Sequence, residues 1–490
     1  MILTDIATAL QYYKLSGNID RIDVTGVEKD STKVKNGDLF ICIKGYRVDG
    51  HDFAKQAEAN GAVAIIAEKS LDVNIPVIIV SDTTRALAII ANKFYNYPTH
   101  NLQLVGVTGT NGKTTVSYLL EQIFRTHQQK TGLIGTIQMK IGDETFPVQN
   151  TTPDALELQR VFRKMQDNKV ETAIMEVSSH ALALGRVHGC EFNIAIFTNL
   201  SQDHLDFHSD MGDYLHAKSL LFSQLGGSYD KENPKYAVIN ADDPSSALLI
   251  KSTAQQVLTY GIESDADIRA TNIKLDANGC QFNLHIFDEQ ILITSKLMGR
   301  FSVYNLLAAA GGAVCAGVPL TTFKQSIEQI SGVNGRFEPV NLGQSYGVIV
   351  DYAHTPDSLE NVLQTISSFA TGKTYVVVGC GGDRDKTKRP LMAKVASDNA
   401  DLAIITSDNP RSEDPQVIVK DMVTGIEKEN YEIILDRKQA IDYAIGLAKG
   451  DDIVLIAGKG HETYQILNDK TIDFDDREVA AEAIQKVSKE

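Results

Sequence analysis

The hydrophobic positions at the start of the chain form short unbroken runs that amphipathic stretches separate. The apolar runs cover residues 37–43, 62–66 and 77–80, and the amphipathic stretches cover residues 51–60 and 83–97. Short apolar runs between turn residues are typical of buried strands, and longer stretches with one apolar face are typical of helices. The beginning of the chain therefore predicts a small α/β domain.

A second α/β region begins after an Asn-Tyr-Pro-Thr sequence near residue 98, which interrupts the helical pattern. Its apolar runs predict strands that helices separate, and this order predicts a mostly parallel sheet. The predicted strands are residues 102–107, 173–177, 194–197 and 236–239. Residues 256–295 have instead the pattern of antiparallel strands, with a turn at residues 276–278.

A third α/β region begins near Arg336, and each of its strong apolar runs is followed by glycine or polar residues. These predicted strands are residues 347–352, 374–379, 402–406 and 453–457. The helical patterns between them predict a doubly wound α/β unit. We therefore predict three domains, at residues 1–100, 101–335 and 336–490. This number agrees with about 150 residues per domain.

Composition narrows the class of protein. The net charge of −16 argues against a nucleic-acid partner, although local arginines, helix N-termini and metal ions still allow an anionic substrate. The five cysteines are scattered without a Cys-x-x-Cys pair, which argues against a disulfide framework and a cysteine zinc site. The sequence shows no signal peptide and no apolar run of about 18 residues. We expect a cytoplasmic, monomeric enzyme without membrane insertion.

The sharpest motif lies between the strand at 102–107 and a helical pattern that starts at Lys113. Glycines there allow backbone N–H groups to surround phosphate oxygens, the helix N-terminus adds positive potential, and Lys113 adds a charge. Thr114 offers a hydroxyl to a magnesium ion. The loop departs from the strict Walker spacing, because Val107 stands where the first glycine is expected. We predict an ATP-binding loop made by Thr108, Gly109, Thr110, Asn111, Gly112, Lys113, Thr114 and Thr115.

Polar residues also follow other strands of the second region, among them Glu176 and Asn199. Ligands of parallel α/β sheets bind beyond the carboxyl ends of the strands, so we expect one composite site there. Glu176 is suited to ligate magnesium together with Thr114, and the alternative is a carboxylate that only faces solvent. Residues 199–208 are rich in Asp and His, but a cap and turn would explain many of them. No zinc-hydrolase ligand set such as His-Glu-x-x-His is present.

Further candidates lie outside this loop. Lys218 lies on a predicted helix and, taken alone, has the pattern of an exposed lysine. The segments at 381–385 and 407–411 follow strands of the third region. For the second of them the alternative is helix initiation, with an Asp or Asn cap and proline in the first turn, but this gives no reason for Arg411. Residues 458–462 resemble a phosphate loop without its final Ser or Thr, and a grip on a second substrate explains them better.

Taken together and in order, six motifs resemble the muramyl ligase family, and within it the members that add the third residue of the peptidoglycan stem peptide. The motifs are TGTNGKTT at 108–115, NTTP at 150–153, MEVSSH at 175–180, DHLD at 203–206, DYAHTP at 351–356 and DNPR at 408–411. The resemblance covers essentially the whole chain. It implies an N-terminal domain for a uridine nucleotide, a central ATPase domain and a C-terminal domain for the incoming amino acid.

The resemblance also implies the reaction. ATP phosphorylates the glutamyl carboxylate of UDP-N-acetylmuramoyl-L-alanyl-D-glutamate, and the amine of the third amino acid displaces phosphate from the acyl phosphate. Both steps build negative charge that magnesium and Lys113 would stabilise. The implied catalytic residues are Lys113, Glu176, His204 and Lys218, and the implied metal ligands are Thr114, Glu176, His204 and Lys218, the last as a carbamate. Asn305 and Arg336 match further contacts to ATP.

Contacts to the two other substrates follow from the same resemblance. The implied contacts to the UDP-linked substrate are Ser31, Tyr46, Arg47, Asn150, Thr151, Thr152, Ser178 and Arg186. The implied contacts to the amino acid are Arg384, Asp408, Asn409, Pro410, Arg411, Gly458 and Glu462. Two positions depart from the family: Leu184 replaces a frequent glutamine, and Ser302 replaces an asparagine seen in some relatives. Each departure puts one contact in doubt.

The implied amino acid is meso-diaminopimelate rather than L-lysine. Diaminopimelate carries an additional distal carboxylate, which the guanidinium of Arg411 can hold through two parallel hydrogen bonds, and Glu462 suits its distal ammonium. Three alternatives remain. They are the same reaction with L-lysine, a ligase like folylpolyglutamate synthase, which would not be expected to carry the N-terminal domain, and a nucleotide-gated binding protein. Clustering of Glu176, His204 and Lys218 argues against the last.

Overall fold

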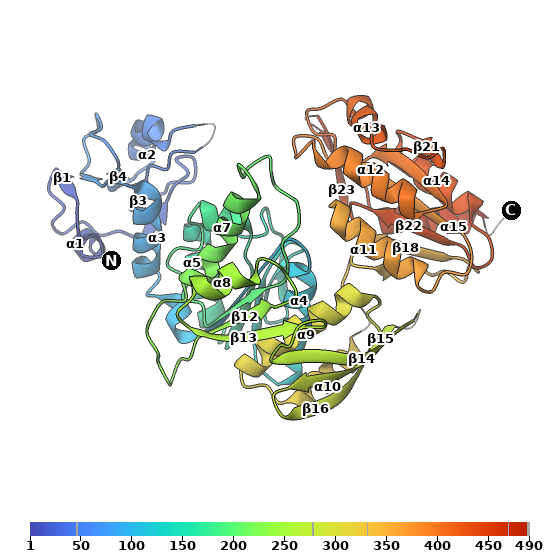
Figure 1. The fold of residues 1–490 in the computed structure, drawn as a ribbon. Helices are drawn as coiled ribbons and strands as arrows, with labels where there is room; N and C mark the ends of the chain where they lie inside the picture. The colour runs from blue at the N-terminus through green and yellow to red at the C-terminus, as the bar shows by residue number, and fades with distance from the viewer. Residues whose placement is uncertain (46–47, 277–278, 331, 469, 488–490) are drawn as a thin grey trace. The chain divides into compact units, whose positions relative to one another are not determined.

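The computed structural model describes residues 1–45, 48–276, 279–330, 332–468 and 470–487 (Figure 1). The chain forms two compact units. The first consists of Met1–Gly106 and Gln129–Asn193, and the second consists of Val107–Gln128 and Ile194–Glu490. Each unit has hydrophobic cores of its own.

A five-stranded sheet opens the first unit, in the order β1-β5-β4-β3-β2. Its strands are β1 (Lys14–Ser16), β2 (Gly26–Glu28), β3 (Asp38–Ile41), β4 (Ala64–Ala67) and β5 (Val77–Ile79). Its helices are α1 (Leu3–Ala7), η1 (Gly50–Phe53), α2 (Ala54–Ala59) and α3 (Thr83–Phe94). Strands β2 to β5 run parallel, and β1 pairs antiparallel with β5. Leu39 and Ile41 pack in one core with α1 and α3, whereas Phe40 packs in a second core with α2. The unbroken apolar runs thus reflect a sheet that is covered on both faces.

Two predicted helices of this region are shorter than expected. In place of one helix at 51–60, the 3-10 turn η1 precedes α2, and the side chain of Asp49 caps this turn. The helix predicted at 83–97 already ends at Phe94, because Asn96 and Tyr97 have φ values of 60° and 49°. A left-handed backbone conformation cannot continue a right-handed helix.

The first unit also contains strands in the order β6-β10-β7-β8-β9. They are β6 (Gln103–Thr108), β7 (Thr131–Ile134), β8 (Met139–Ile141), β9 (Glu144–Phe146) and β10 (Thr172–Glu176), and the helical segments are η2 (Pro98–Asn101), α5 (Ala155–Asp167) and α6 (Ser179–Ala183). β10 pairs parallel with β7, while β7, β8 and β9 are antiparallel. The chain passes into the second unit within β6.

The second unit continues with strands in the order β11-β12-β13-β14-β15-β16. They are β11 (Ile194–Phe197), β12 (Tyr236–Asn240), β13 (Gln256–Gly261), β14 (Ile268–Asp276), β15 (Gly279–Ile286) and β16 (Glu289–Ser295). The helices are α4 (Lys113–Thr126), α7 (Met211–Ser223), α8 (Ser246–Ser252), α9 (Arg300–Cys315) and α10 (Leu320–Gln329). β14 to β16 are antiparallel as predicted, but β13 pairs parallel with both of its neighbours, so the antiparallel prediction is wrong there. Part of the predicted turn, residues 277–278, lies outside the described residues.

A six-stranded sheet ends the second unit, in the order β17-β18-β22-β19-β20-β21. Its strands are β17 (Glu338–Pro339), β18 (Gly347–Asp351), β19 (Thr374–Cys380), β20 (Leu402–Ser407), β21 (Tyr431–Ile433) and β22 (Ile453–Ala457), and β23 (Tyr464–Leu467) and β24 (Lys470–Asp473) form a hairpin. Its helices are α11 (Pro356–Ser367), α12 (Lys388–Asn399), α13 (Pro415–Val423), α14 (Arg437–Leu447) and α15 (Asp476–Val487). One core joins the sheet to α11, α12 and α13, and another joins it to α14 and α15. The predicted doubly wound α/β architecture is confirmed.

Two further predictions concern the whole described chain. All five cysteines are free thiols, and three of them are buried. Among the described residues no helix combines the length and the apolar character that a membrane span requires.

Candidate active site

Two glycines shape the loop between β6 and α4. Gly109 and Gly112 have φ values of 150° and 86°, which glycine adopts without strain. A Cβ atom on Gly109 would overlap the hydroxyl of Thr198, and one on Gly112 would overlap Oδ1 of Asn305. The loop therefore has no room for a side chain at either glycine.

The end of β11 holds this loop in place. Asn199 accepts hydrogen bonds from the backbone N–H of Asn111, at 2.9 Å, and of Thr110, at 2.8 Å. Thr198 donates to the Asn111 carbonyl at 2.6 Å, and the Tyr214 hydroxyl lies 3.1 Å from Thr110 Oγ1. The loop thus has a fixed conformation without any ligand.

Helix α4 begins without a side-chain cap. Its N-cap residue is Gly112, so no capping side chain accepts from the first backbone N–H groups. Arg336 Nη2 donates to Thr114 Oγ1 in this first turn, at 3.0 Å. Arg336 Nε and Thr108 Oγ1 are buried atoms without a hydrogen-bond partner within the described part of the chain. An uncapped helix N-terminus with nearby donors fits a phosphate group.

Two lysines converge on one carbonyl of the loop. Lys113 Nζ donates to the carbonyls of Gly109, at 3.0 Å, and Thr110, at 2.8 Å, and Lys218 Nζ donates to Gly109 at 2.8 Å. Lys218 is only 1% exposed, so the reading of an exposed lysine is wrong. Its burial and, next, the charge of Lys113 lower the pKa of Lys218 well below its ordinary value, which favours the neutral amine.

A cavity of about 320 Å³ adjoins the loop in the second unit. Asn305 and Arg336, the two predicted ATP contacts outside the loop, both line it. Phe301 and Tyr304 line it as well and offer aromatic surface on which a nucleobase can stack. Asn111, Gly112 and Thr115 of the loop line the same cavity, so five of the ten predicted ATP contacts surround it. Ser302, one of the two departures, donates its hydroxyl within α9 to the Met298 carbonyl at 2.6 Å.

Asp203 organises the surroundings of His204. Its buried carboxylate lies 3.5 Å from His204 Nε2, 3.6 Å from His354 Nε2 and 3.4 Å from Lys388 Nζ. Burial by itself raises the pKa of Asp203, but the hydrogen bond from His354 and the neighbouring positive charges hold this pKa well below its ordinary value. An ionised Asp203 therefore orients three basic side chains.

Glu176 occupies the end of β10 in the first unit and is fully buried, so it does not simply face solvent. One of its carboxylate oxygens accepts from the backbone N–H of Thr136 and the other accepts from the Thr136 hydroxyl, both at 2.9 Å. A Cβ atom on Gly135 would overlap this carboxylate. The strand end thus presents an oriented, buried carboxylate.

The predicted metal ligands belong to different units, Glu176 to the first and Thr114, His204 and Lys218 to the second. Within the described ranges no group of three or more His, Cys, Asp or Glu side chains converges as a metal site. Magnesium prefers oxygen ligands and usually binds through one or two carboxylates together with substrate phosphates and water. The buried carboxylate of Glu176 in the first unit and the Thr114 hydroxyl in the second each offer the kind of oxygen that magnesium prefers.

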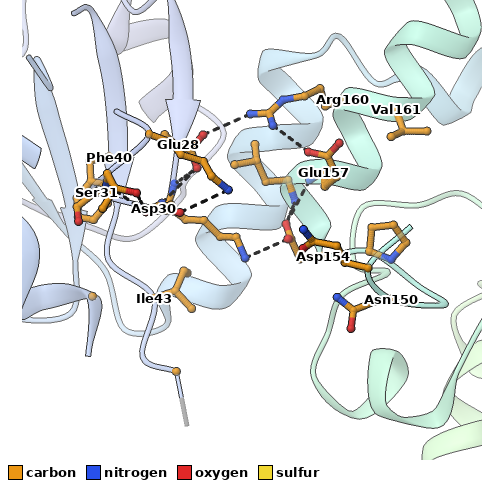
Figure 2. A pocket seen from close by; sticks show the side chains of 18 of the residues that line it. Glu28, Asp30, Ser31, Phe40, Ile43, Asn150, Asp154, Glu157, Arg160 and Val161 are labelled. Carbon is orange, nitrogen blue, oxygen red and sulfur yellow. Dashed lines mark hydrogen bonds and ion pairs between the residues drawn. The ribbon is translucent and has the colours of Figure 1, made fainter. Parts of the chain in front are cut away.

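A larger cavity, of about 820 Å³, lies in the first unit. Ser31 and Asn150, two of the predicted contacts to the UDP-linked substrate, line it, and Figure 2 shows them on either side of Asp154. Lys29 pairs with Asp154 at 3.0 Å, and Arg160 pairs with Glu157 at 2.8 Å. Tyr46 and Arg47, predicted for the same substrate, lie outside the described residues.

The other predicted contacts to this substrate form a second group near the end of β10. The Thr152 hydroxyl donates to the Glu176 carbonyl at 2.8 Å and accepts from the backbone N–H of Ser178 at 3.1 Å. Arg186 Nη1 donates to the Thr152 carbonyl at 3.1 Å, and the Thr151 hydroxyl lies 3.1 Å from that of Thr136. These residues surround the Glu176 segment rather than the large cavity. Leu184, the other departure from the family, is the C-cap of α6.

The predicted amino-acid contacts lie on three loops that follow β19, β20 and β22, which are neighbours in the sheet. Arg384 follows β19, residues 408–411 follow β20, and Gly458 and Glu462 follow β22. The backbone N–H of Gly382 donates to the Asn409 carbonyl at 2.9 Å. The sheet therefore brings together side chains that are far apart in the sequence.

Helix initiation does not explain the segment at 408–411. The next helix, α13, begins only at Pro415, and Asp414 caps it. Arg411 has a φ of 52°, and its guanidinium donates to the Gly382 carbonyl at 2.8 Å. Its backbone N–H donates to the Ile466 carbonyl at 3.2 Å. The chain thus holds Arg411 in an unusual backbone conformation between two loops.

Side chains connect the loops after β20 and β22. Asn409 Nδ2 donates to Glu462 Oε2 at 2.9 Å, and Lys459 Nζ lies 3.3 Å from Asn409 Oδ1 and 3.2 Å from Glu462 Oε2. Burial and then the charge of Asp408 raise the pKa of Glu462. A Cβ atom on Gly458 would lie 2.9 Å from Asp408 Oδ2. Arg384, in contrast, is exposed and donates to the carbonyl of its neighbour at 3.1 Å.

Four side chains of these sites had no role in the sequence-based prediction: Thr136, Asp203, Tyr214 and Lys459. Tyr214 precedes Lys218 by one helical turn, so a helical projection indicates their contact, and Lys218 Nζ lies 4.3 Å from the Tyr214 ring. Asp203 and Lys459 lie inside motifs that were noted without a role for them. Nothing in the sequence indicated a role for Thr136. It follows β7, and this strand was not predicted.

A glycine-shaped loop, an uncapped helix and a nucleotide-sized cavity at the carboxyl ends of parallel strands define a nucleotide-binding α/β protein. Three family models match most of the chain: the Mur ligase family catalytic domain at residues 23–95, the Mur ligase middle domain at 107–313 and the Mur ligase glutamate ligase domain at 335–460. The chain belongs to the Mur ligase family.

Individual relatives agree with this assignment. A protein of Oceanobacillus iheyensis named UDP-N-acetylmuramoyl-L-alanyl-D-glutamate--2,6-diaminopimelate ligase is 57% identical over 490 residues, 99% of each chain. A solved structure with the same enzyme name is 36% identical and has a TM-score of 0.71 over 98% of this chain and 99% of its own. A folylpolyglutamate synthase of Mycobacterium tuberculosis is 15% identical, with a TM-score of 0.64 over 77% of this chain and 93% of its own. That last likeness concerns the fold alone.

Proposed function

We propose that this protein is an ATP-dependent ligase that joins meso-2,6-diaminopimelate to UDP-N-acetylmuramoyl-L-alanyl-D-glutamate in peptidoglycan synthesis. The observation that carries this proposal is the full-length likeness, at 57% identity, to a relative with that activity in its name. The loops after β19, β20 and β22 support the choice of amino acid, since they place Arg411 and Glu462 at one edge of the sheet.

The reaction uses ATP and magnesium. An oxygen of the glutamyl carboxylate attacks the γ-phosphorus of ATP and ADP leaves; the amine then attacks the acyl carbon, and phosphate leaves with the former carboxylate oxygen. Lys113 and the uncapped N-terminus of α4 stabilise the phosphate charge, and Asn305 and Arg336 hold the nucleotide in its cavity. The remaining proposed ATP contacts are Thr108, Gly109, Thr110, Asn111, Gly112, Thr114 and Thr115.

Magnesium, when bound, neutralises phosphate charge, and Thr114, Glu176, His204 and Lys218 are its proposed ligands. The lowered pKa of Lys218 supports a carbamate at this residue, because the neutral amine is the form that adds to carbon dioxide. In that reaction the Nζ–carbon bond forms and one proton leaves. The product carries two oxygens and a negative charge in place of an ammonium group that Lys113 would repel.

The large cavity of the first unit is the proposed site of the uridine nucleotide, with Ser31 and Asn150 on its lining and Tyr46 and Arg47 as further contacts. The residues around Glu176 are the proposed contacts to the dipeptide. They are Thr151, Thr152, Ser178 and Arg186. This division places the nucleotide in the large cavity and the reacting carboxylate near Glu176.

The proposed amino-acid contacts are Arg384, Asp408, Asn409, Pro410, Arg411, Gly458 and Glu462. The Arg411 guanidinium pairs with the distal carboxylate, and Glu462 with the distal ammonium. Lysine has no distal carboxylate, so it would leave the Arg411 guanidinium unpaired in the site. Selectivity therefore comes from the cost of this unpaired charge as well as from the missing ion pair.

The organisation of the molecule is proposed on the same basis. Residues 1–100 bind the UDP-linked substrate, residues 101–335 form the ATPase domain and residues 336–490 bind the amino acid. We further propose a monomer that works in the cytoplasm on small-molecule substrates, without a nucleic acid. Light scattering and cell fractionation test these two statements.

One experiment separates the candidate activities. The purified protein is incubated with ATP, magnesium and UDP-N-acetylmuramoyl-dipeptide, together with meso-diaminopimelate or L-lysine in separate reactions. A further reaction contains ATP, magnesium, a folate and glutamate. Phosphate release is measured, and mass spectrometry identifies the product. The expected result is a product heavier by one diaminopimelate residue, with little product from lysine. A lysine product of equal yield contradicts the diaminopimelate assignment. Glutamate addition to a folate substrate, without activity on the UDP-dipeptide, contradicts the whole proposal.

A further inference from the structure

A buried ion pair lies beneath the proposed amino-acid site. Arg437 and Asp476 are the first residues of α14 and α15, and both side chains are fully buried. Arg437 Nε and Nη2 donate to the two carboxylate oxygens of Asp476, at 2.8 and 2.7 Å. This two-bond geometry fixes the plane of the guanidinium.

The same guanidinium also reaches the ends of two strands. Nη2 donates to the carbonyl of Ala457, the last residue of β22, at 2.9 Å, and Nη1 donates to the carbonyl of Ser407, the last residue of β20, at 3.4 Å. In the sheet order these strands lie on either side of β19. The residues that follow the two carbonyls are Gly458 and Asp408. One side chain therefore holds the beginnings of both loops that carry the proposed contacts to the amino acid.

Packing alone gives little reason for a charged pair here. The macrodipole of α14 disfavours a cation at its first residue, and a buried ion pair seldom stabilises a fold more than apolar side chains of similar volume. Further along the same helices, Ile441, Ala444, Val479 and Ala480 pack in one apolar core. What apolar side chains cannot do is bind two strand-end carbonyls in a fixed geometry.

We propose that Arg437 is a positioning residue for the amino-acid site, and that it acts by holding the last carbonyls of β20 and β22 so that Asp408, Asn409, Gly458 and Glu462 face the same ligand. Asp476 orients Arg437 for this task. The inference rests on the proposed function, because it takes the loops after these strands as the amino-acid site. It adds to that function a residue pair that lies outside the site itself.

The test compares Arg437→Lys and Asp476→Asn with a control just before the start of β22. Lysine keeps the charge but has one nitrogen, so it cannot hold Asp476 and both carbonyls together. The control is Asp452→Asn, at the opposite end of β22, where Asp452 accepts from the backbone N–H of Lys373 at 2.7 Å and of Lys449 at 3.0 Å. For every protein, kcat, the KM for each of the three substrates and the thermal midpoint are measured.

The expected result is a selective effect. Both variants raise the KM for diaminopimelate by about 10- to 100-fold, as removal of a group that orients ligand-binding residues usually does. The KM values for ATP and for the UDP-dipeptide stay within about twofold, because those interactions are unchanged. The double variant is no worse than Arg437→Lys alone, since the two residues act as one unit. Asp452→Asn lowers the thermal midpoint but leaves the KM for diaminopimelate unchanged.

Several results overturn the inference. A KM for diaminopimelate that does not change, three KM values that rise together, or failure of both variants to accumulate as folded protein would make the pair purely structural. Arg411→Ala, measured in parallel, separates this outcome from a failure of the proposed function. If Arg411→Ala also leaves the KM for diaminopimelate unchanged, the amino-acid site itself is wrongly assigned. If Arg411→Ala raises it and Arg437→Lys does not, only the positioning role is wrong.

Discussion

The two proposed ligand-binding edges of the second unit differ in how their helices begin. At the phosphate loop, α4 begins at Gly112 without a side-chain cap, so main-chain N–H groups remain for a ligand. In the C-terminal sheet, Thr355, Asp414 and Asp436 cap the helices α11, α13 and α14. There the candidate contacts are side chains, among them Arg411. In the proposed function, the first edge therefore combines backbone groups with Lys113, whereas the second relies on side chains alone.

This difference has a physical consequence. Phosphate groups are alike in every nucleotide, and fixed backbone dipoles are sufficient to bind them. An amino acid must be distinguished from close analogues, which requires charges at defined positions. Main-chain groups do not titrate, whereas the carboxylates that support the second edge do. Substitution and acid should therefore affect the two edges differently.

The largest effect is expected from Lys113→Ala at the phosphate loop. Loss of a group that stabilises the transferring phosphoryl charge typically lowers the rate by about 10² to 10³-fold. The loss should be equal for every amino acid offered, because Lys113 acts before the amine enters. Phosphate release and circular dichroism are the measurements, with the exposed Lys231→Ala as control. Near-normal turnover of a folded Lys113→Ala protein would show that this lysine does not act on phosphate.

Arg411→Ala should affect only one amino acid. Removing one partner of a charge pair of this kind costs about 2 kcal/mol, so kcat/KM for diaminopimelate should fall by about 30-fold while the value for lysine changes little. Competition between the two amino acids, followed by mass spectrometry, gives the ratio directly. Arg163→Ala, on the surface of α5, is the control. An equal loss for both amino acids would mean that Arg411 supports the fold rather than selectivity.

Low pH should destabilise the C-terminal sheet edge, because it protonates Glu413. Its carboxylate accepts from Arg389 at 2.8 Å and from the backbone N–H of Asp383 at 2.6 Å, next to Arg384. The hydrogen bond from Arg389 lowers the pKa of Glu413 from its ordinary value of 4.5 to about 2. Because the folded-state pKa is lowered, this stabilisation is fully present above pH 4.5 and is lost as the pH falls towards 2.

Glu413→Gln should therefore lower the free energy of unfolding by about 2 kcal/mol at pH 7. Below about pH 4, the free energies of unfolding of the variant and of the unchanged protein should become more similar. Urea denaturation at several pH values measures this difference. Glu427→Gln, a 78% exposed member of a surface ion pair, should have no effect at any pH. A difference that is independent of pH would mean that Glu413 acts through packing and not through charge.

The smallest effect concerns a helix cap. Thr355 forms a capping box with Ser358 at the start of α11, and Thr355→Ala should cost about 1 kcal/mol of stability. The KM values for diaminopimelate and for the UDP-dipeptide should stay unchanged, whereas the KM for ATP should rise slightly, because Asp357 and Ser358 of this helix end line the proposed nucleotide cavity. Thermal unfolding with the exposed Thr371→Ala as control gives the comparison. An unchanged KM for ATP would mean that this end of α11 does not contribute to nucleotide binding.

The phosphate loop was predictable from sequence because its determinants are local. The strand, the turn and the helix are contiguous, and glycine at positions 109 and 112 indicates the backbone conformation directly. The buried strands were predictable for a related reason, since each apolar run is itself the strand. The C-terminal loops were named from the resemblance to the family, and they lie at one edge because parallel strands bring their carboxyl ends together.

Other features depend on distant contacts and had no local pattern. The burial of Lys218 results from its hydrogen bond to Gly109, 109 residues earlier in the chain. The direction of β13 depends on its neighbours, which a run of apolar residues does not reveal. The short strand β7 contains Thr131 and Gly132 and therefore lacks an unbroken apolar run. The left-handed conformation of Arg411 likewise follows from contacts to two other segments, and no propensity predicts it.

The five free cysteines have a practical consequence for chemical labelling. Burial raises the pKa of each thiol to about 12, so hardly any thiolate is present near neutral pH. Maleimides and iodoacetamides react with the thiolate, and the native cysteines should resist them while the protein stays folded. A single cysteine introduced on the surface would then carry a fluorophore selectively, without prior removal of the native ones. Pairs of such labels would allow distances between the two units to be followed in solution while substrates are added.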